Sequence, residues 1–209
     1  MNSYIVEYID KNIIPLYRNF DAAHREDHVR SVINASLKMA GHYDVNVEMV
    51  YVIAAFHDTG LIIDRENHHL ESGTIVRNDP MIQGFFSAEQ VEIMVQAVED
   101  HRASNKKEPR SIYGKIVAEA DRLIESRDIV RRTIQYGLYH YPSLDKEGLW
   151  KRTLEHLHEK YAEGGYLSLW IPESDNGEEL KKLQTLIKDK MGLRLLFDNL
   201  YLELQKTIK

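Results

Sequence analysis

A histidine and an aspartate, His57 and Asp58, stand side by side where an apolar stretch runs into Gly60. Residues 47–56 upstream are almost continuously apolar, which predicts a helix buried on most sides with the polar pair at its C-terminal end. Burial of such a pair is unfavourable unless something coordinates or hydrogen-bonds it. Imidazole nitrogen and carboxylate oxygen together suit zinc, iron, manganese and related divalent ions. The pair therefore indicates part of a metal site, whose other ligands must come from elsewhere in the chain.

Two further polar residues, His28 and Asp121, also lie in otherwise apolar helical patterns. With the pair they give the order His, His-Asp, Asp along the chain. The intervals between them are so long that three separate helices must converge to bring the four side chains together. The alternative is that all four are polar residues satisfied by their own hydrogen bonds, with no metal between them.

Three stretches around these residues resemble, in the same order, the successive motifs of the HD-domain metal-dependent phosphohydrolases. The resemblance covers about residues 20–130, and the three motifs together are far more specific than the His-Asp dipeptide alone. The stretches are residues 24–32 (HREDHVRSV), 54–60 (AAFHDTG) and 116–123 (IVAEADRL).

This resemblance implies an all-helical HD domain that holds a divalent metal. A metal with an open coordination position lowers the pKa of its water ligand, and its charge stabilises phosphoryl oxygens, so the implied reaction is hydrolysis of a phosphate ester or anhydride. The choice among Mn, Fe, Co, Mg, Ni and Zn stays open at this stage. Carried over position by position, the implied ligands are His28, His57, Asp58 and Asp121.

Some branches of the superfamily add two histidines between the His-Asp pair and the last Asp to hold a second metal. His69 and His101 fall in that interval. Residues 115–128 also resemble the branch that hydrolyses symmetrical dinucleoside tetraphosphates. His69 has a rival in the adjacent His68, and an ordinary loop histidine is the alternative interpretation for it.

His101 also has a second interpretation, as a proton donor or a phosphate contact, because it lies at a predicted helix end beside Glu99 and Arg102. For phosphate recognition the sequence favours Arg25 and Arg122, each close to a predicted ligand, since a guanidinium group can bind two phosphate oxygens at once. The alternative for each arginine is an ordinary surface position.

The elements that must position these residues are all predicted to be helices, because apolar residues recur at helical spacing and no strand-like alternation competes. Asp21, Asn46 and Ser87 are predicted N-caps, the last with Gln90 in a capping box. Residues 103–110 are predicted to be an exposed loop and residues 166–172 an irregular segment. The expected helices cover residues 4–20, 21–42, 46–57, 70–77, 87–101, 111–125, 128–139, 146–163 and 175–206. Pro15 is expected to end or kink the first, and the last is one long helix or two broken near Gly192.

Length and composition set the limits of the prediction. The 209 residues carry 27 Lys and Arg against 33 Asp and Glu, so the net charge of −6 disfavours strong nucleic-acid binding. The chain has no cysteine, no apolar run of transmembrane length and no signal-peptide pattern, from which we expect a cytoplasmic protein with no membrane association. We expect one HD-type domain over residues 1–209, with a motif-bearing core at about 20–130 and the helices of residues 145–209 packed on it.

The sequence thus favours a metal-dependent phosphohydrolase for a phosphorylated small molecule, with a nucleotide as the favoured class. Phosphatase, pyrophosphatase and phosphodiesterase activities are not separated. Three alternatives stay open: a dinuclear dinucleoside-polyphosphate hydrolase that also uses His69 and His101, a non-catalytic module of the same fold that senses a nucleotide, and a helical interaction protein. The oligomeric state is also open, and a homodimer is one of the states to test.

Overall fold

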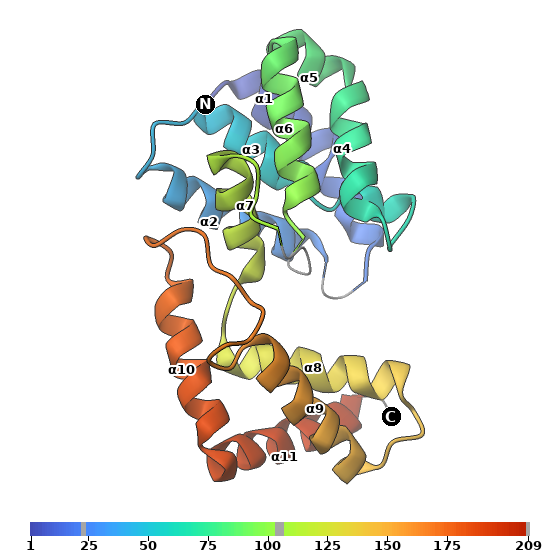
Figure 1. The fold of residues 1–209 in the computed structure, drawn as a ribbon. Helices are drawn as coiled ribbons and strands as arrows, with labels where there is room; N and C mark the ends of the chain where they lie inside the picture. The colour runs from blue at the N-terminus through green and yellow to red at the C-terminus, as the bar shows by residue number, and fades with distance from the viewer. Residues whose placement is uncertain (22–23, 103–106, 208–209) are drawn as a thin grey trace. The chain divides into compact units, whose positions relative to one another are not determined.

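The computed structural model describes residues 1–21, 24–102 and 107–207. Within these ranges the chain forms α-helices and two short 3-10 helices with no strand, which confirms the all-α prediction (Figure 1). Packing divides the chain into two compact units, one of residues 1–123 with 170–174 and the other of residues 124–169 with 175–209. The expectation of one domain, with the C-terminal helices packed on the core, stays a prediction.

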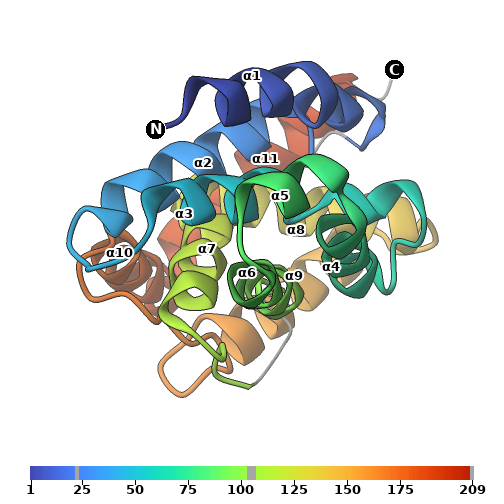
Figure 2. The same ribbon diagram turned by 90° about the horizontal axis from the view of Figure 1, so that it is seen from above.

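The first unit is built around α3, whose residues 49–56 are all buried. Figure 2 shows α6 between α4 and α7, and α6 packs against both. Polar side chains placed at the ends of these helices therefore face a common region. The elements are α1 (Ser3–Asn12), η1 (Ile14–Asn19), α2 (Glu26–Ala40), α3 (Val47–Phe56), η2 (Thr59–Ile62), α4 (His68–Asn78), α5 (Pro80–Phe85), α6 (Ala88–Asp100) and α7 (Ile112–Arg122).

Two of the three predicted helix caps are confirmed. The side chain of Asn46 accepts hydrogen bonds from the first backbone amides of α3, and Ser87 forms the complete capping box with Gln90 at the start of α6. The prediction for Asp21 is wrong, because α2 begins only at Glu26 and Asp21 instead pairs with His24 and Arg65. A cap must lie directly before the first helical turn, and Asp21 lies too far upstream.

Two prolines explain where the N-terminal elements depart from the predicted helices. The helix expected over residues 4–20 ends at Asn12 and continues as η1, since Pro15 has no amide hydrogen to donate to an α-helical bond. Helix α5, which starts at Pro80 and is capped by the side chain of Asp79, was not predicted from the sequence. Residues 103–106 of the predicted exposed loop lie outside the described residues.

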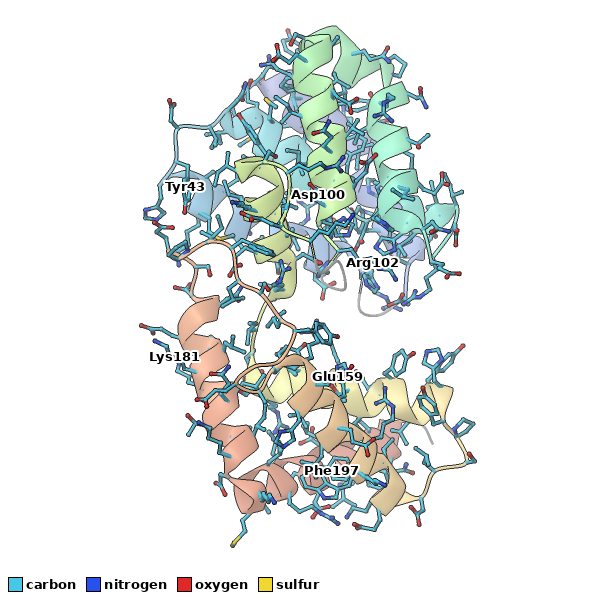
Figure 3. All side chains as sticks on the ribbon, in the orientation of Figure 1. Tyr43, Asp100, Arg102, Glu159, Lys181 and Phe197 are labelled. Carbon is cyan, nitrogen blue, oxygen red and sulfur yellow. The ribbon has the colours of Figure 1, made fainter. Side chains whose placement is uncertain are left out.

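The second unit has its own apolar core, in which Phe197, labelled in Figure 3, packs against Trp150 and Tyr201. The long C-terminal helical pattern is broken at Asp189, three residues before Gly192, and the Asp189 carboxylate accepts a hydrogen bond from the Gly192 amide. No helix in the described ranges is long and apolar enough to cross a membrane. The helices of this unit are α8 (Ser126–His140), α9 (Lys146–Lys160), α10 (Asn176–Lys188) and α11 (Lys190–Thr207).

Residues 170–174 lie between two segments of the second unit in the sequence but pack with the first unit. The carboxylate of Glu119, fully buried on α7, accepts a hydrogen bond from the Trp170 amide at 2.7 Å and one from the Ser174 hydroxyl at 2.5 Å. This segment has neither helix nor strand, as predicted for residues 166–172. Glu119 therefore anchors the segment to the helix that carries Asp121.

Candidate metal centre

The C-terminal end of α3 is closed by side chains instead of by further helical turns. The last carbonyl oxygens of a helix have no partner within it, and a buried helix end must satisfy them in another way. Here the carbonyls of Ala54, Ala55 and Phe56 each accept a side-chain hydrogen bond. The donors, in that order, are His57 Nδ1 at 2.8 Å, Tyr17 Oη at 2.9 Å and Thr59 Oγ1 at 2.8 Å.

This arrangement fixes which nitrogen of the His57 ring carries the lone pair when the ring is neutral. Because Nδ1 donates its hydrogen to the Ala54 carbonyl, the lone pair of the neutral ring lies on Nε2. A carbonyl or carboxylate partner on the far nitrogen is the usual support for a histidine that binds metal. The side chain is completely buried, so Nε2 faces only other protein groups.

The structure brings the four predicted ligands together from α2, α7 and the end of α3. Nε2 of His28 lies 3.3 Å from Nε2 of His57, 3.2 Å from Oδ1 of Asp121 and 3.6 Å from Oδ2 of Asp58. Nε2 of His57 lies 3.1 Å from Oδ2 of Asp58 and 3.7 Å from Oδ1 of Asp121. Neighbouring ligands that each lie about 2.1 Å from one ion are separated by about 3.0–3.5 Å. His28, His57 and Asp58 are therefore mutually close enough to share one divalent ion, and Asp121 faces both histidines. Their role as ligands remains a prediction.

Asp58 carries the clearest sign that the group suits a cation. Its Oδ2 atom is buried, and no described residue donates a hydrogen bond of good geometry to it, although His57 Nε2 lies 3.1 Å away. A buried carboxylate oxygen without a donor is costly, and a positively charged ion would satisfy it. The same ion would accept the lone pairs of the two facing imidazole nitrogens of His28 and His57.

The electrostatics keep both carboxylates charged. Burial alone would raise the pKa of Asp58, but the charge of His57 and a hydrogen bond from His101 hold this pKa well below its usual range. Burial would likewise raise the pKa of Asp121, and the hydrogen bond with His28 and the charge of His57 lower it. Burial lowers the pKa of His57, but the charges of Asp58 and Asp121 outweigh this effect and raise it to about 9. Without a metal, His57 thus holds a proton between two carboxylates, in the place that a cation would take.

The other carboxylate oxygen of Asp58 faces a second group of ligand atoms. Oδ1 lies 3.4 Å from Nε2 of His101 and 3.5 Å from Nε2 of His68. Both rings donate Nδ1–H to a carbonyl three residues earlier, as His57 does: His101 to Val98 at 2.6 Å and His68 to Arg65 at 2.9 Å. Asp58, His68 and His101 therefore form a second set of atoms close enough to share an ion, with Asp58 common to both sets.

His69, which the sequence analysis named with His101, lies in neither group. The structure places its neighbour His68 beside Asp58, while the buried Nδ1 of His69 has no hydrogen-bond partner among the described residues. Burial lowers the pKa of His69, as does the nearby charge of His101. No sequence signal selects His68 over His69, because the hydrogen bond between His68 and the Arg65 carbonyl is a contact of the folded chain.

The predicted phosphate contacts lie close to the predicted ligands in the chain but differ in exposure. Arg25 is the exposed N-cap residue of α2, and the half-buried Arg122 donates a hydrogen bond to the Ala118 carbonyl within α7. Arg102, labelled in Figure 3 beyond the end of α6, donates a hydrogen bond to the Glu66 carbonyl at 2.8 Å. The phosphate-binding roles of Arg25 and Arg122 stay predictions.

Comparison with known proteins gives one family and one solved structure. Residues 25–125 match the family model of the HD domain. The chain is also similar to the crystal structure of a predicted HD superfamily hydrolase from an uncultured Thermotogales bacterium, with 20% identity, a TM-score of 0.49, and coverage of 73% of this chain and 82% of that one. No curated protein matches the chain. The HD match and the two His/Asp groups together support a metal-dependent hydrolase.

Proposed function

Because residues 25–125 match the HD-domain family model, we propose that the chain is a metal-dependent phosphohydrolase acting on a phosphorylated small molecule, with nucleotides as the favoured class. The observation that carries the proposal is the buried Oδ2 of Asp58, which receives no hydrogen bond of good geometry from the described residues and faces the Nε2 atoms of His28 and His57. A divalent ion is the group that satisfies these three atoms together.

The residues of the site would divide the work as follows. His28, His57, Asp58 and Asp121 would hold the ion, and the carbonyl partner of His57 would keep its Nε2 lone pair directed at it. When bound, the ion lowers the pKa of water and stabilises charge on phosphoryl oxygens. His101 is the candidate proton donor to the leaving group, while Arg25 and Arg122 are the candidate phosphate contacts.

A second candidate is a dinuclear hydrolase of dinucleoside polyphosphates. The group of Asp58, His68 and His101 favours it, because Oδ1 of Asp58 lies close to the Nε2 atoms of His68 and His101 while Oδ2 faces His28 and His57. A carboxylate with one oxygen in each group is suited to bridge two ions. In this version His101 is a ligand and cannot serve as the proton donor, so the two candidates assign it incompatible roles.

The test is metal analysis of the purified chain, with phosphate and pyrophosphate release from a nucleotide panel in added Mn²⁺, Mg²⁺, Fe²⁺ or Co²⁺. Wild type, His57→Ala and His140→Ala are compared, the last being an exposed histidine of α8 outside both groups. We expect metal-dependent release in wild type and His140→Ala and none in folded His57→Ala. Stoichiometric metal with no turnover on any substrate would favour the nucleotide-sensing module instead.

The products and the metal content separate the two enzymatic candidates. One ion per chain with release of phosphate or pyrophosphate supports the mononuclear version. Two ions with symmetrical cleavage of dinucleoside tetraphosphates to two nucleoside diphosphates supports the dinuclear one. A cytoplasmic location and a homodimeric state are further expectations, to be checked by fractionation and light scattering.

A further inference from the structure

Tyr17 lies behind the His-Asp turn although it comes from η1, outside the residues that match the HD family model. Its side chain is completely buried, and its ring centroid lies 6.2 Å from that of His57. The hydroxyl donates to the Ala55 carbonyl at 2.9 Å and accepts a hydrogen bond from the Asp58 amide at 3.3 Å. One hydroxyl thus connects the backbone on both sides of His57.

The turn that this hydroxyl closes sets the backbone angles of Asp58. Asp58 has φ −108° and ψ 5° and joins the end of α3 to η2. These angles set the direction in which the Asp58 side chain leaves the backbone. That direction places Oδ2 toward His57 and Oδ1 toward His101.

We propose that Tyr17 is a positioning residue for the metal centre, acting through the backbone of Asp58 and without touching the ion. The proposal rests on the proposed function, because it assumes that the His/Asp group binds a metal. A phenylalanine would fill the same buried space, so core packing alone does not require the hydroxyl. The role of the hydroxyl is instead to bond the Ala55 carbonyl and the Asp58 amide of the turn.

The chain offers a matched control at the opposite end of α3. The hydroxyl of Tyr113 accepts a hydrogen bond from the Asn46 amide at 2.9 Å, just before the helix begins. Tyr113→Phe therefore removes a tyrosine hydroxyl that also bonds the backbone at an end of α3, but far along the helix from His57 and Asp58. A loss that is specific to Tyr17→Phe cannot be ascribed to weakening of α3 in general.

The experiment titrates Co²⁺ alone into the metal-stripped full chain and follows its visible absorption, which reports both affinity and coordination geometry. Wild type, Tyr17→Phe and Tyr113→Phe are compared, with thermal unfolding of each metal-free protein. We expect Tyr17→Phe to bind Co²⁺ about tenfold more weakly and with an altered spectrum, as is typical when a partner of a metal ligand is removed. Tyr113→Phe should bind within about twofold of wild type, by contrast with that tenfold loss.

The remaining outcomes each overturn the proposal in a recognisable way. Wild-type affinity and spectrum in Tyr17→Phe would show that the hydroxyl does not position the ligands. Equal weakening in both variants, in proportion to their lost stability, would make the role of Tyr17 purely structural. No Co²⁺ binding by wild type would remove the proposed metal site itself. If Tyr17→Phe does not fold alone, all three proteins are compared in trimethylamine N-oxide, which stabilises folded states.

Discussion

Nε2 of His57 lies 3.1 Å from Oδ2 of Asp58, the next residue in the chain. The other oxygen of the same carboxylate lies 3.4 Å from Nε2 of His101. The Asp58 side chain thus faces both groups of His/Asp atoms, with one oxygen toward each. This geometry makes Asp58 the residue whose replacement has the widest effect.

Replacement of Asp58 by Asn should weaken metal binding at both groups. The amide keeps the shape of the side chain but removes the negative charge, and its NH₂ group would face either Nε2 of His57 or the pair of His68 and His101. We expect the affinity for the first ion to fall by about tenfold or more. Metal analysis after dialysis, with circular dichroism to verify the fold, measures this. Wild-type metal content in Asp58→Asn would contradict the assignment.

The second prediction distinguishes His68 from the adjacent His69. His68→Gln should reduce the metal content or affinity of the second group, because Nε2 of His68 lies 3.5 Å from Asp58. His69→Gln should leave both groups intact, since His69 lies in neither. Co²⁺ titrations of the two variants measure the stoichiometry. The reverse result would restore the original expectation for His69.

Metal binding should strengthen as the pH rises to about 9. Burial lowers the pKa of His57, but the neighbouring carboxylates outweigh burial and raise this pKa to about 9. Below that pH, His57 holds a proton that the incoming ion must displace. The affinity should therefore fall by up to about tenfold for each unit of pH below 9 and become constant above it. Co²⁺ or Mn²⁺ titrations between pH 6 and 10, with an indicator dye to count released protons, test this. A constant affinity between pH 7 and 9 would show that His57 binds no displaceable proton.

The sequence was sufficient where the deciding interactions are local or where a motif names the residue. The caps at Asn46 and Ser87 depend on amides two and three residues away, and both were predicted. The convergence of His28, His57, Asp58 and Asp121 followed from the motif order, and the structure brings these side chains together. Helix boundaries were predicted less well: the break expected near Gly192 lies at Asp189, whose carboxylate accepts a hydrogen bond from the Gly192 amide.

The remaining features depend on tertiary contacts that leave no local pattern. The choice between His68 and His69 is made by which ring faces Asp58 once α4 has packed, and both residues have the same type and similar exposure. Tyr17 contacts the His-Asp turn across an interval of 41 residues, outside any motif. Adjacent or distant residues of this kind can be assigned only once the helices have been placed.

Gly60 should be intolerant of any side chain, because it packs directly against the start of α4. A Cβ atom there would lie 2.6 Å from the Ser72 amide and would also collide with the His68 carbonyl. Gly60→Ala should therefore destabilise the fold by about 1–3 kcal/mol and displace His68 from Asp58. Gly84→Ala is the control, since a Cβ on that α5 glycine meets no atom within 4 Å. Equal thermal stability of the two variants would contradict this account of η2 and α4.

Glu119 should be a determinant of stability that can be separated from metal binding, although it lies only two residues before Asp121 on α7. Glu119→Ala would leave the partly buried Trp170 amide and Ser174 hydroxyl without their carboxylate partner, at a cost of about 3 kcal/mol. Glu119→Gln should cost less, because its carbonyl oxygen can still accept from the amide while the serine hydroxyl rotates to accept from the NH₂ group.

Urea unfolding, followed by tryptophan fluorescence that includes Trp170, gives the free energy of unfolding for each variant. An unchanged free energy in Glu119→Ala would mean that residues 170–174 are held by other contacts, whereas a full loss of Co²⁺ binding in folded Glu119→Gln would place Glu119 in the support of Asp121.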